Sequence, residues 1–174
     1  MQLVSRATAI VATPRTEWPL IEREPAAPFS LLANYVAILA AIPAVAGFIG
    51  KSLVGAYTPI LAGLLRALIA YLAMFAVVYV IACVIDLLAP RFGGERNFDN
   101  ALKLAVYAHT PFWLAGIFLL IPGLHFLLVL GLYGLHLLWT GLPVLMRAPQ
   151  YRLLPYTVIV AVCELVPAVV LAVM

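Results

Sequence analysis

Long apolar runs, separated by short polar segments, fill the chain after residue 28. A helix needs about 20 apolar residues to cross a hydrocarbon layer of roughly 30 Å. Runs long enough to span occur at five ranges, 29–49, 59–88, 104–121, 124–145 and 154–174. The second range is too long for a perpendicular span, so its helix must tilt or project beyond the bilayer. The pattern therefore predicts an all-α polytopic membrane protein, a bundle of five transmembrane helices.

The segment before these runs has a different pattern. Apolar residues recur there at roughly helical spacing, and charged residues flank Trp18. A short helix that lies in the membrane interface, with Trp18 as its anchor, accounts for this pattern. A flexible lead-in to the first span is the alternative. The chain therefore divides into a cytosolic tail, 1–28, which is partly an interfacial helix, and a five-helix membrane domain, 29–174.

Composition supports a membrane protein. Hydrophobic residues make up 66% of the chain and charged residues 10%, with a mean hydropathy of +1.14. A soluble domain carries about 25% charged residues. This shortage of charge excludes a disordered chain, an ordinary soluble enzyme and a nucleic-acid-binding surface.

Cys83 and Cys163 lie within apolar runs, and we expect both to be buried, inert thiols.

Basic residues are distributed unevenly between the two ends of the expected bundle. The tail and the two loops on its side hold eight of them: Arg6, Arg15, Arg23, Arg91, Arg96, Lys103, Arg147 and Arg152. The opposite side holds only Lys51, and Arg66 lies within the second span. Short loops rich in lysine and arginine stay in the cytoplasm. We therefore expect a cytoplasmic N-terminus and an external C-terminus.

Two ionisable residues interrupt the apolar runs, Arg66 in the second span and Glu164 in the fifth. A charge at the centre of a span costs about 2.5–3.5 kcal/mol on insertion scales, and such charges commonly pair with one another. We expect these two side chains to interact, directly or through water. A structural interhelical pair, a protonated Glu164 and a proton or ion pathway are all open.

Asp86, His109 and His136 form a weaker candidate cluster in the inner half of the bundle. A two-histidine metal site there would need further ligands, and Asp86 is the only nearby candidate. We therefore expect imidazoles that hydrogen-bond across helices, with no metal and no cofactor. The sequence also has no motif for nucleophilic catalysis or phosphate binding, so we expect no enzymatic activity.

Two strings in the third and fourth spans carry a resemblance to a known family. They are Phe98-Asp-Asn-Ala-Leu-Lys-Leu-Ala-Val-Tyr-Ala-His-Thr-Pro and Leu132-Tyr-Gly-Leu-His-Leu-Leu-Trp-Thr-Gly-Leu-Pro-Val-Leu-Met. With Trp113-Leu-Ala-Gly-Ile, Ile121-Pro-Gly-Leu and Pro155-Tyr156, they resemble the Ypt/Rab-interacting protein (YIP) family, and the tail is similar to that of its bacterial members. His109 and His136 stand where the family has tyrosine or another uncharged residue.

This resemblance implies a five-span bundle with a cytosolic N-terminus, in a bacterial plasma (inner) membrane. Eukaryotic relatives contact small GTPases through a longer N-terminal region, so the short tail argues against a GTPase partner. We expect a non-enzymatic protein that binds or scaffolds other membrane proteins, as a subunit of a larger complex or as a homo-oligomer, with membrane lipids around it. The alternative is a transporter or channel for an ion, proton or small solute that uses Arg66 and Glu164.

Overall fold

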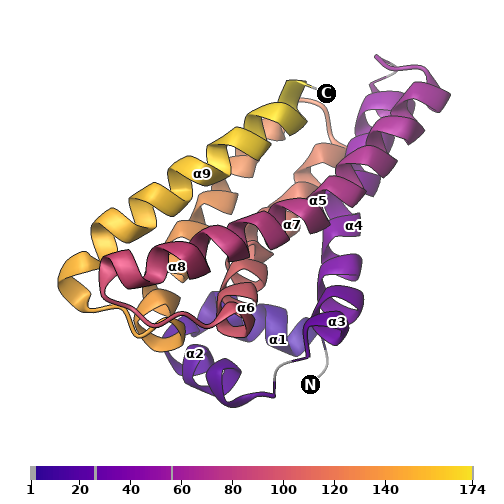
Figure 1. Ribbon diagram of the computed structural model, residues 1–174. Helices are drawn as coiled ribbons and strands as arrows, with labels where there is room; N and C mark the ends of the chain where they lie inside the picture. Colours follow the sequence, from indigo (N-terminus) through magenta and orange to yellow (C-terminus); the bar gives the residue numbers. More distant parts are fainter. Residues whose placement is uncertain (1–2, 26, 56, 174) are drawn as a thin grey trace.

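The apolar runs form helices in the computed structural model of the protein (Figure 1). The structure describes the backbone of three stretches, 3–25, 27–55 and 57–173. Side chains are described as far as Val166. Residues 1–2 and 26 of the expected tail, and residue 174 of the expected fifth span, lie outside this part. The regular elements within it are all helical, which confirms the all-α fold class.

The helices after the tail form five consecutive rods. The first joins α3 (Pro28–Leu31), a π-helical segment (Leu32–Val36), α4 (Ala37–Phe48) and a second π-helical segment (Ile49–Val54). The second is α5 (Ile60–Leu88) with a 3-10 turn (Ala89–Phe92). The third joins α6 (Phe98–Ala108), α7 (Thr110–Ala115) and a 3-10 segment (Gly116–Leu120). The fourth joins a 3-10 segment (His125–Leu132) to α8 (Tyr133–Leu145), and the fifth joins a 3-10 turn (Gln150–Arg152) to α9 (Leu153–Val173).

Within the described residues, four rods are long and apolar enough to cross a membrane: Pro28–Val54, Ile60–Phe92, Phe98–Leu120 and His125–Leu145. The last helix, α9, has 21 residues. Its side chains are described only in its first part, so a fifth span stays a prediction.

The third rod begins at Phe98, ahead of the expected residue 104, because Asn97 caps it. The backbone N–H of Asn100 donates to Asn97 Oδ1 over 3.0 Å, which is the usual N-cap bond.

The third rod lies at the centre of the bundle. In its most apolar stretch 67% of residues are buried, against 22% to 33% in the other three candidate spans. The neighbouring rods approach it closely. A Cβ atom on Gly134 of α8 would lie 2.4 Å from the Ala108 carbonyl oxygen, so only glycine fits at this crossing.

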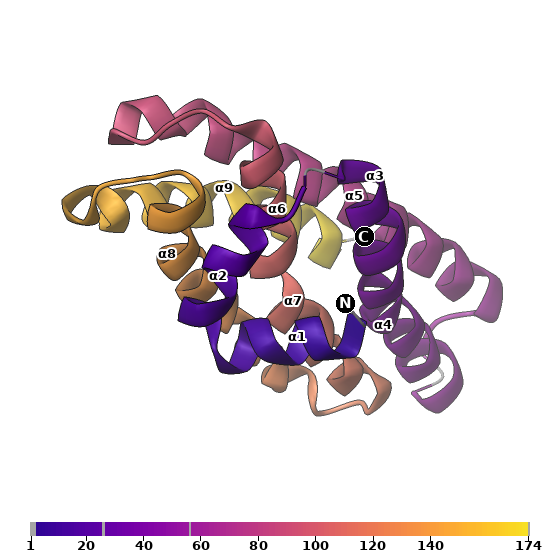
Figure 2. The same cartoon turned by 90° about the horizontal axis from the view of Figure 1, so that it is seen from below.

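The tail covers one end of this bundle. Its helices α1 (Leu3–Ala12) and α2 (Pro14–Arg23) lie across the ends of the rods when the molecule is viewed from below (Figure 2). Four apolar side chains at helical spacing, Ala7, Ile10, Trp18 and Ile21, are buried. Tyr133 at the start of α8 donates from its hydroxyl to the Val11 carbonyl oxygen over 3.0 Å. We call this end of the molecule the tail end.

Helix α9 lies beside α5, and the two run antiparallel (Figure 1). The Tyr156 hydroxyl at the start of α9 donates to the Ile85 carbonyl near the end of α5. The first half of α5 instead lies against α4 and carries large exposed apolar side chains along its other side: Leu61, Leu64, Leu65, Leu68, Ile69 and Leu72. This half of α5 therefore offers an apolar surface to the membrane.

Candidate functional site

Four charged residues meet where the tail joins the bundle. We call Arg6, Glu17, Glu24 and Lys103 the tail-end cluster. The Arg6 guanidinium is 4% exposed and donates to Glu17 Oε2 over 2.7 Å, and it also pairs with the Glu24 carboxylate. Lys103 Nζ, on the central rod, donates to the carbonyl oxygens of Ile21 (3.1 Å) and Glu24 (2.7 Å). Lys103 thereby satisfies carbonyls at the carboxyl end of α2, where the helix dipole favours a cation.

A chain of aromatic rings continues from this cluster into the bundle. The Trp18 and Tyr107 rings meet edge to face with centroids 6.4 Å apart, and Tyr107 meets Tyr35 in the same way at 4.9 Å. The hydroxyl groups of Tyr35 and Thr110 share a hydrogen bond of 2.9 Å. The tail is therefore connected to the first and third rods through packed rings as well as through charges.

The burial of Trp18 corrects its predicted role. We expected this residue to anchor the tail among lipid head groups, but its side chain is 0% exposed. Its Nε1 donates to Thr140 Oγ1 of α8 over 3.1 Å, and its ring lies against Gly141. The amphipathic pattern of the tail is therefore satisfied by protein surface, and α2 packs onto α8.

The tail-end cluster does not follow from the expected spans, because their bounds place Lys103 in a loop before the third span. Asn97, followed by Asp99 and Asn100, is a helix-start signal that moves Lys103 onto α6. Lys103, Tyr107 and Thr110 then fall on one face, at spacings of four and three residues. The sequence has no comparable signal that pairs Arg6 with Glu17 and Glu24.

The structure does not bring Arg66 and Glu164 together. The bond from Tyr156 to Ile85 sets the register of the antiparallel helices α9 and α5. From this level Glu164 lies about 12 Å along α9 and Arg66 about 28 Å along α5, at 1.5 Å per residue. The separation of about 16 Å is too large for a direct ion pair, and Glu164 instead lies near the His109 imidazole. An interaction through water stays a prediction.

Arg66 itself is exposed on the apolar surface of α5. It takes part in no ion pair or hydrogen bond with the described side chains. Its immediate surroundings are apolar, with Leu65 53% and Ile69 46% exposed. Ala62 and Ala70 lie one turn before and one turn after it. An unpaired cation therefore stands on a surface that faces lipid or a partner.

The expected cluster of Asp86, His109 and His136 is not assembled either. Asp86 Oδ2 accepts two hydrogen bonds from Arg96, from Nε at 3.0 Å and from Nη2 at 2.8 Å. His109 Nδ1 shares a hydrogen bond of 2.8 Å with the Ala105 carbonyl of its own rod, and His136 is exposed beside Tyr133. Among the described residues, no group of three histidine, cysteine or acidic side chains has the arrangement of a metal site.

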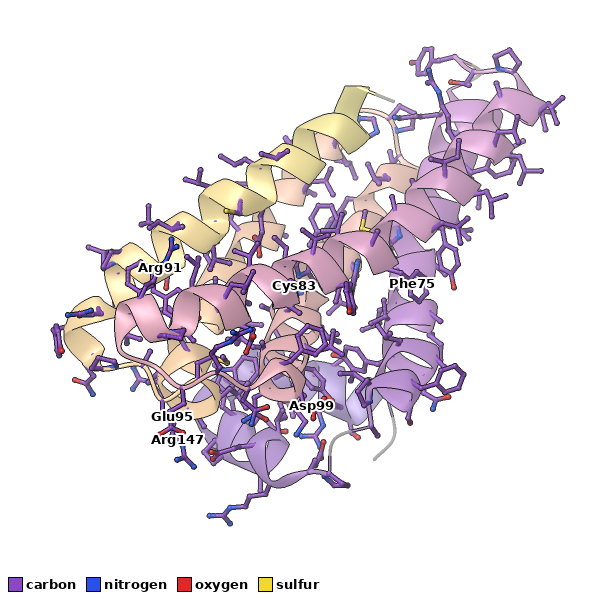
Figure 3. All side chains as sticks on the ribbon, in the orientation of Figure 1. Phe75, Cys83, Arg91, Glu95, Asp99 and Arg147 are labelled. Atoms are coloured by element: carbon purple, nitrogen blue, oxygen red, sulfur yellow. The ribbon has the colours of Figure 1, made fainter. Side chains whose placement is uncertain are left out.

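The two loops at the tail end are joined by polar contacts. Figure 3 shows Glu95 and Arg147 side by side, and their charged groups are 3.1 Å apart. Arg152 Nη1 donates to the Arg91 carbonyl oxygen over 2.9 Å. The tail and the two basic loops therefore come together at one end of the molecule.

Cys83 and Cys163 are free and half-buried, so both are less buried than we expected.

The comparison with protein families agrees with this architecture. The Yip1 domain matches residues 8–172, which include most of the tail, the central rod and nearly all of α9. Neither a curated protein nor a solved structure matches the chain. Because the domain covers nearly the whole chain, the resemblance to the YIP family is confirmed. The chain belongs to the Yip1 domain family.

Proposed function

We propose that the chain is a non-enzymatic membrane protein that binds other membrane proteins within the bilayer, as a scaffold or as a subunit of a larger complex. We place it in a bacterial plasma membrane, with the tail end in the cytoplasm and the C-terminus outside. Eight of the ten basic residues belong to the tail, to the two loops at the tail end and to the start of α6. This excess supports the proposed orientation, because basic loops stay in the cytoplasm.

The observation that carries the proposal is the exposed, unpaired Arg66. It lies six residues into α5, about 9 Å from the start of the helix. A cation on a lipid-facing helix surface is expensive, and ionisable residues within spans are usually paired within protein. The small neighbours Ala62 and Ala70 allow another helix backbone to come close. A carboxylate on a helix of a second membrane protein would pair with Arg66 and remove that cost.

The transporter alternative has weaker support. It requires Arg66 and Glu164 to act on one pathway, but about 16 Å separates them along the helices. The side chains that the central rod buries inside the bundle are mainly apolar, among them Leu102, Leu104 and Trp113. We therefore do not propose transport as the function.

Site-specific photo-crosslinking in native membranes tests the proposal. A photoreactive residue at Leu65, on the exposed side of α5, should form an adduct with one protein of defined mass. The adduct should persist with Arg66→Lys, which keeps the charge, and should be lost with Arg66→Leu. The same photoreactive residue at Val129, which is 57% exposed on another rod, serves as the control position.

Two results would contradict the proposal. In the first, Leu65 forms adducts with lipid alone, which would mean that Arg66 reaches the phosphate groups of the bilayer. In the second, the same protein is captured equally from Leu65 and Val129, and its capture does not change with Arg66→Leu.

A further inference from the structure

A hollow of about 200 Å³ opens beside the tail-end cluster, where the tail joins the first rod. Helices α1 and α3, the residues that follow α2, the first π-helical segment and the start of α6 all contribute to its lining. Its lining includes the polar residues Arg6, Glu24, Ser30, Asn34, Asp99 and Lys103. Pockets for drug-sized ligands have volumes of about 300–1,000 Å³. This smaller hollow therefore suits a small polar group.

The hollow presents both signs of charge. Arg6 and Lys103 supply two cations, and Glu24 and Asp99 supply two carboxylates. Lys103 is 7% exposed and uses two of its three N–H donors on carbonyl oxygens, so one donor has no acceptor among the described residues. Asp99 is exposed and makes no hydrogen bond with the described residues. A ligand with an anionic and a cationic group would use both the free donor and the free carboxylate.

The position of the hollow relative to the candidate membrane spans indicates the source of such a ligand. Its walls include the first turn of Pro28–Val54 and the first turns of Phe98–Leu120, which are two candidate membrane spans. The hollow thus lies at the level where the bilayer begins. Phe29, in the same first turn, is 85% exposed and extends the apolar surface beside it. A molecule that combines a charged head with apolar chains fits this position.

We infer that the hollow binds the head group of a phospholipid with a primary ammonium, phosphatidylethanolamine. Its phosphate faces the free Lys103 donor, and its ammonium faces the carboxylates of Asp99 and Glu24. A primary ammonium donates hydrogen bonds to carboxylates, whereas the trimethylammonium of phosphatidylcholine has no N–H to donate. A purely anionic head group would meet two carboxylates as well as the two cations. This inference does not depend on the proposed function.

Native mass spectrometry of the full chain tests this site. The protein is released from nanodiscs that contain phosphatidylethanolamine, phosphatidylcholine and phosphatidylglycerol in equal amounts, and the retained lipid is identified. We expect phosphatidylethanolamine to be retained about tenfold more than either other lipid, the preference expected from one hydrogen bond between charged groups. Asp99→Asn should lower this preference about tenfold. Glu22→Gln, which removes a carboxylate of α2 outside the hollow, should leave it unchanged.

The thermal unfolding of Asp99→Asn in phosphatidylcholine nanodiscs shows whether that variant keeps its fold. Equal retention of phosphatidylethanolamine and phosphatidylcholine by the wild-type protein would overturn the inference. A preference for phosphatidylglycerol would also overturn it, since it would indicate a site for anions alone. A folded Asp99→Asn protein that keeps the full preference would do the same.

Discussion

At the scale of single residues, Trp18 holds the tail to the bundle. Its ring is buried between α2 and α8, its Nε1 donates to Thr140, and its ring meets that of Tyr107 on the central rod edge to face. Tryptophan combines a large apolar area with one polar N–H that needs a partner when buried. Both requirements are met inside the protein, so this side chain contributes to stability through packing and through one hydrogen bond.

Replacement of Trp18 should separate these two contributions. Trp18→Ala should lower the free energy of unfolding by about 3–5 kcal/mol, the usual loss for a large buried ring. Trp18→Phe keeps most of the ring and should cost less, because it removes the bond to Thr140 and only part of the packing. Chemical unfolding in detergent measures both. Trp139→Ala, on α8 next to Thr140 in the sequence and 36% exposed, is the control, and an equal loss there would contradict the assigned role of Trp18.

The buried pair of Arg6 and Glu17 allows a second prediction. Arg6→Met leaves the Glu17 carboxylate, which is 8% exposed, without its cation. Loss of one partner of a buried pair costs about 3–5 kcal/mol, whereas replacement of both is often nearly neutral. The double variant Arg6→Met, Glu17→Met should therefore be more stable than Arg6→Met alone. If thermal unfolding showed purely additive losses, the two side chains would not be coupled.

At the scale of helices, the packing of α8 on its neighbours depends on glycine. A Cβ atom on Gly141 would lie 2.5 Å from Leu104 Cδ1 and 2.8 Å from Trp18 Cε2. Gly141 therefore lets α8 touch the central rod and the tail at the same point. A larger residue there must push one of these side chains away.

We expect Gly141→Ala to lower the free energy of unfolding by about 1–3 kcal/mol, the usual range for an overpacked core. It should also increase protease cleavage within the tail, because Trp18 is displaced. Gly47→Ala provides a matched control, since its new Cβ would meet Leu119 Cδ1 at an ordinary 3.7 Å. A Gly141→Ala protein as stable and as protease-resistant as Gly47→Ala would refute the close contact.

The sequence predicts where each helix begins and ends better than it predicts which helices pack against one another. The apolar run at 59–88 corresponds closely to α5, because its length and its polar flanks mark both ends. The position of each rod is harder to predict, since lipid and protein interiors both accept apolar side chains. One signal was present. The most apolar stretch of the central rod has a mean hydropathy of 1.3 and is 67% buried, whereas the corresponding stretch of the second rod has a mean hydropathy of 2.8 and is 28% buried. The more polar helix lies inside.

The candidate site was less predictable for a related reason. Long-range pairs such as Arg6 with Glu17 depend on how the tail folds back, which periodicity does not reveal. Arg66 and Glu164 were grouped because both are charged, but helix register separates them. Asp86 has a partner from the adjoining loop, Arg96, and His109 is bonded to its own helix. Side-chain type indicated that these residues are unusual, and only packing identifies their partners.

At the scale of the whole molecule, the charged residues are concentrated at the tail end. The tail and the loops beside Glu95 and Arg147 meet there, whereas Lys51 and Arg66 lie toward the other end. The exposed apolar helices between these ends suit a lipid bilayer. The asymmetry predicts one orientation in the membrane.

Reporter fusions check this orientation. Alkaline phosphatase fused to the C-terminus should be active, because that enzyme works only outside the cytoplasm, and a fluorescent protein fused there should stay dark. The same reporters fused to the N-terminus should give the opposite pattern. Strong fluorescence from the C-terminal fusion would refute the proposed topology and would indicate four spans in place of five.

The central claim is that this chain binds a second membrane protein through Arg66. The protein mass of the particle that contains the chain tests this claim most directly. The full chain is extracted from native membranes in polymer-bounded lipid discs, and the protein mass of each particle is measured by native mass spectrometry. We predict a second membrane protein in constant ratio to the 18.8 kDa chain, retained with Arg66→Lys and lost with Arg66→Leu. Particles that contain only this chain, with the same mass for the wild type and for Arg66→Leu, would contradict the account.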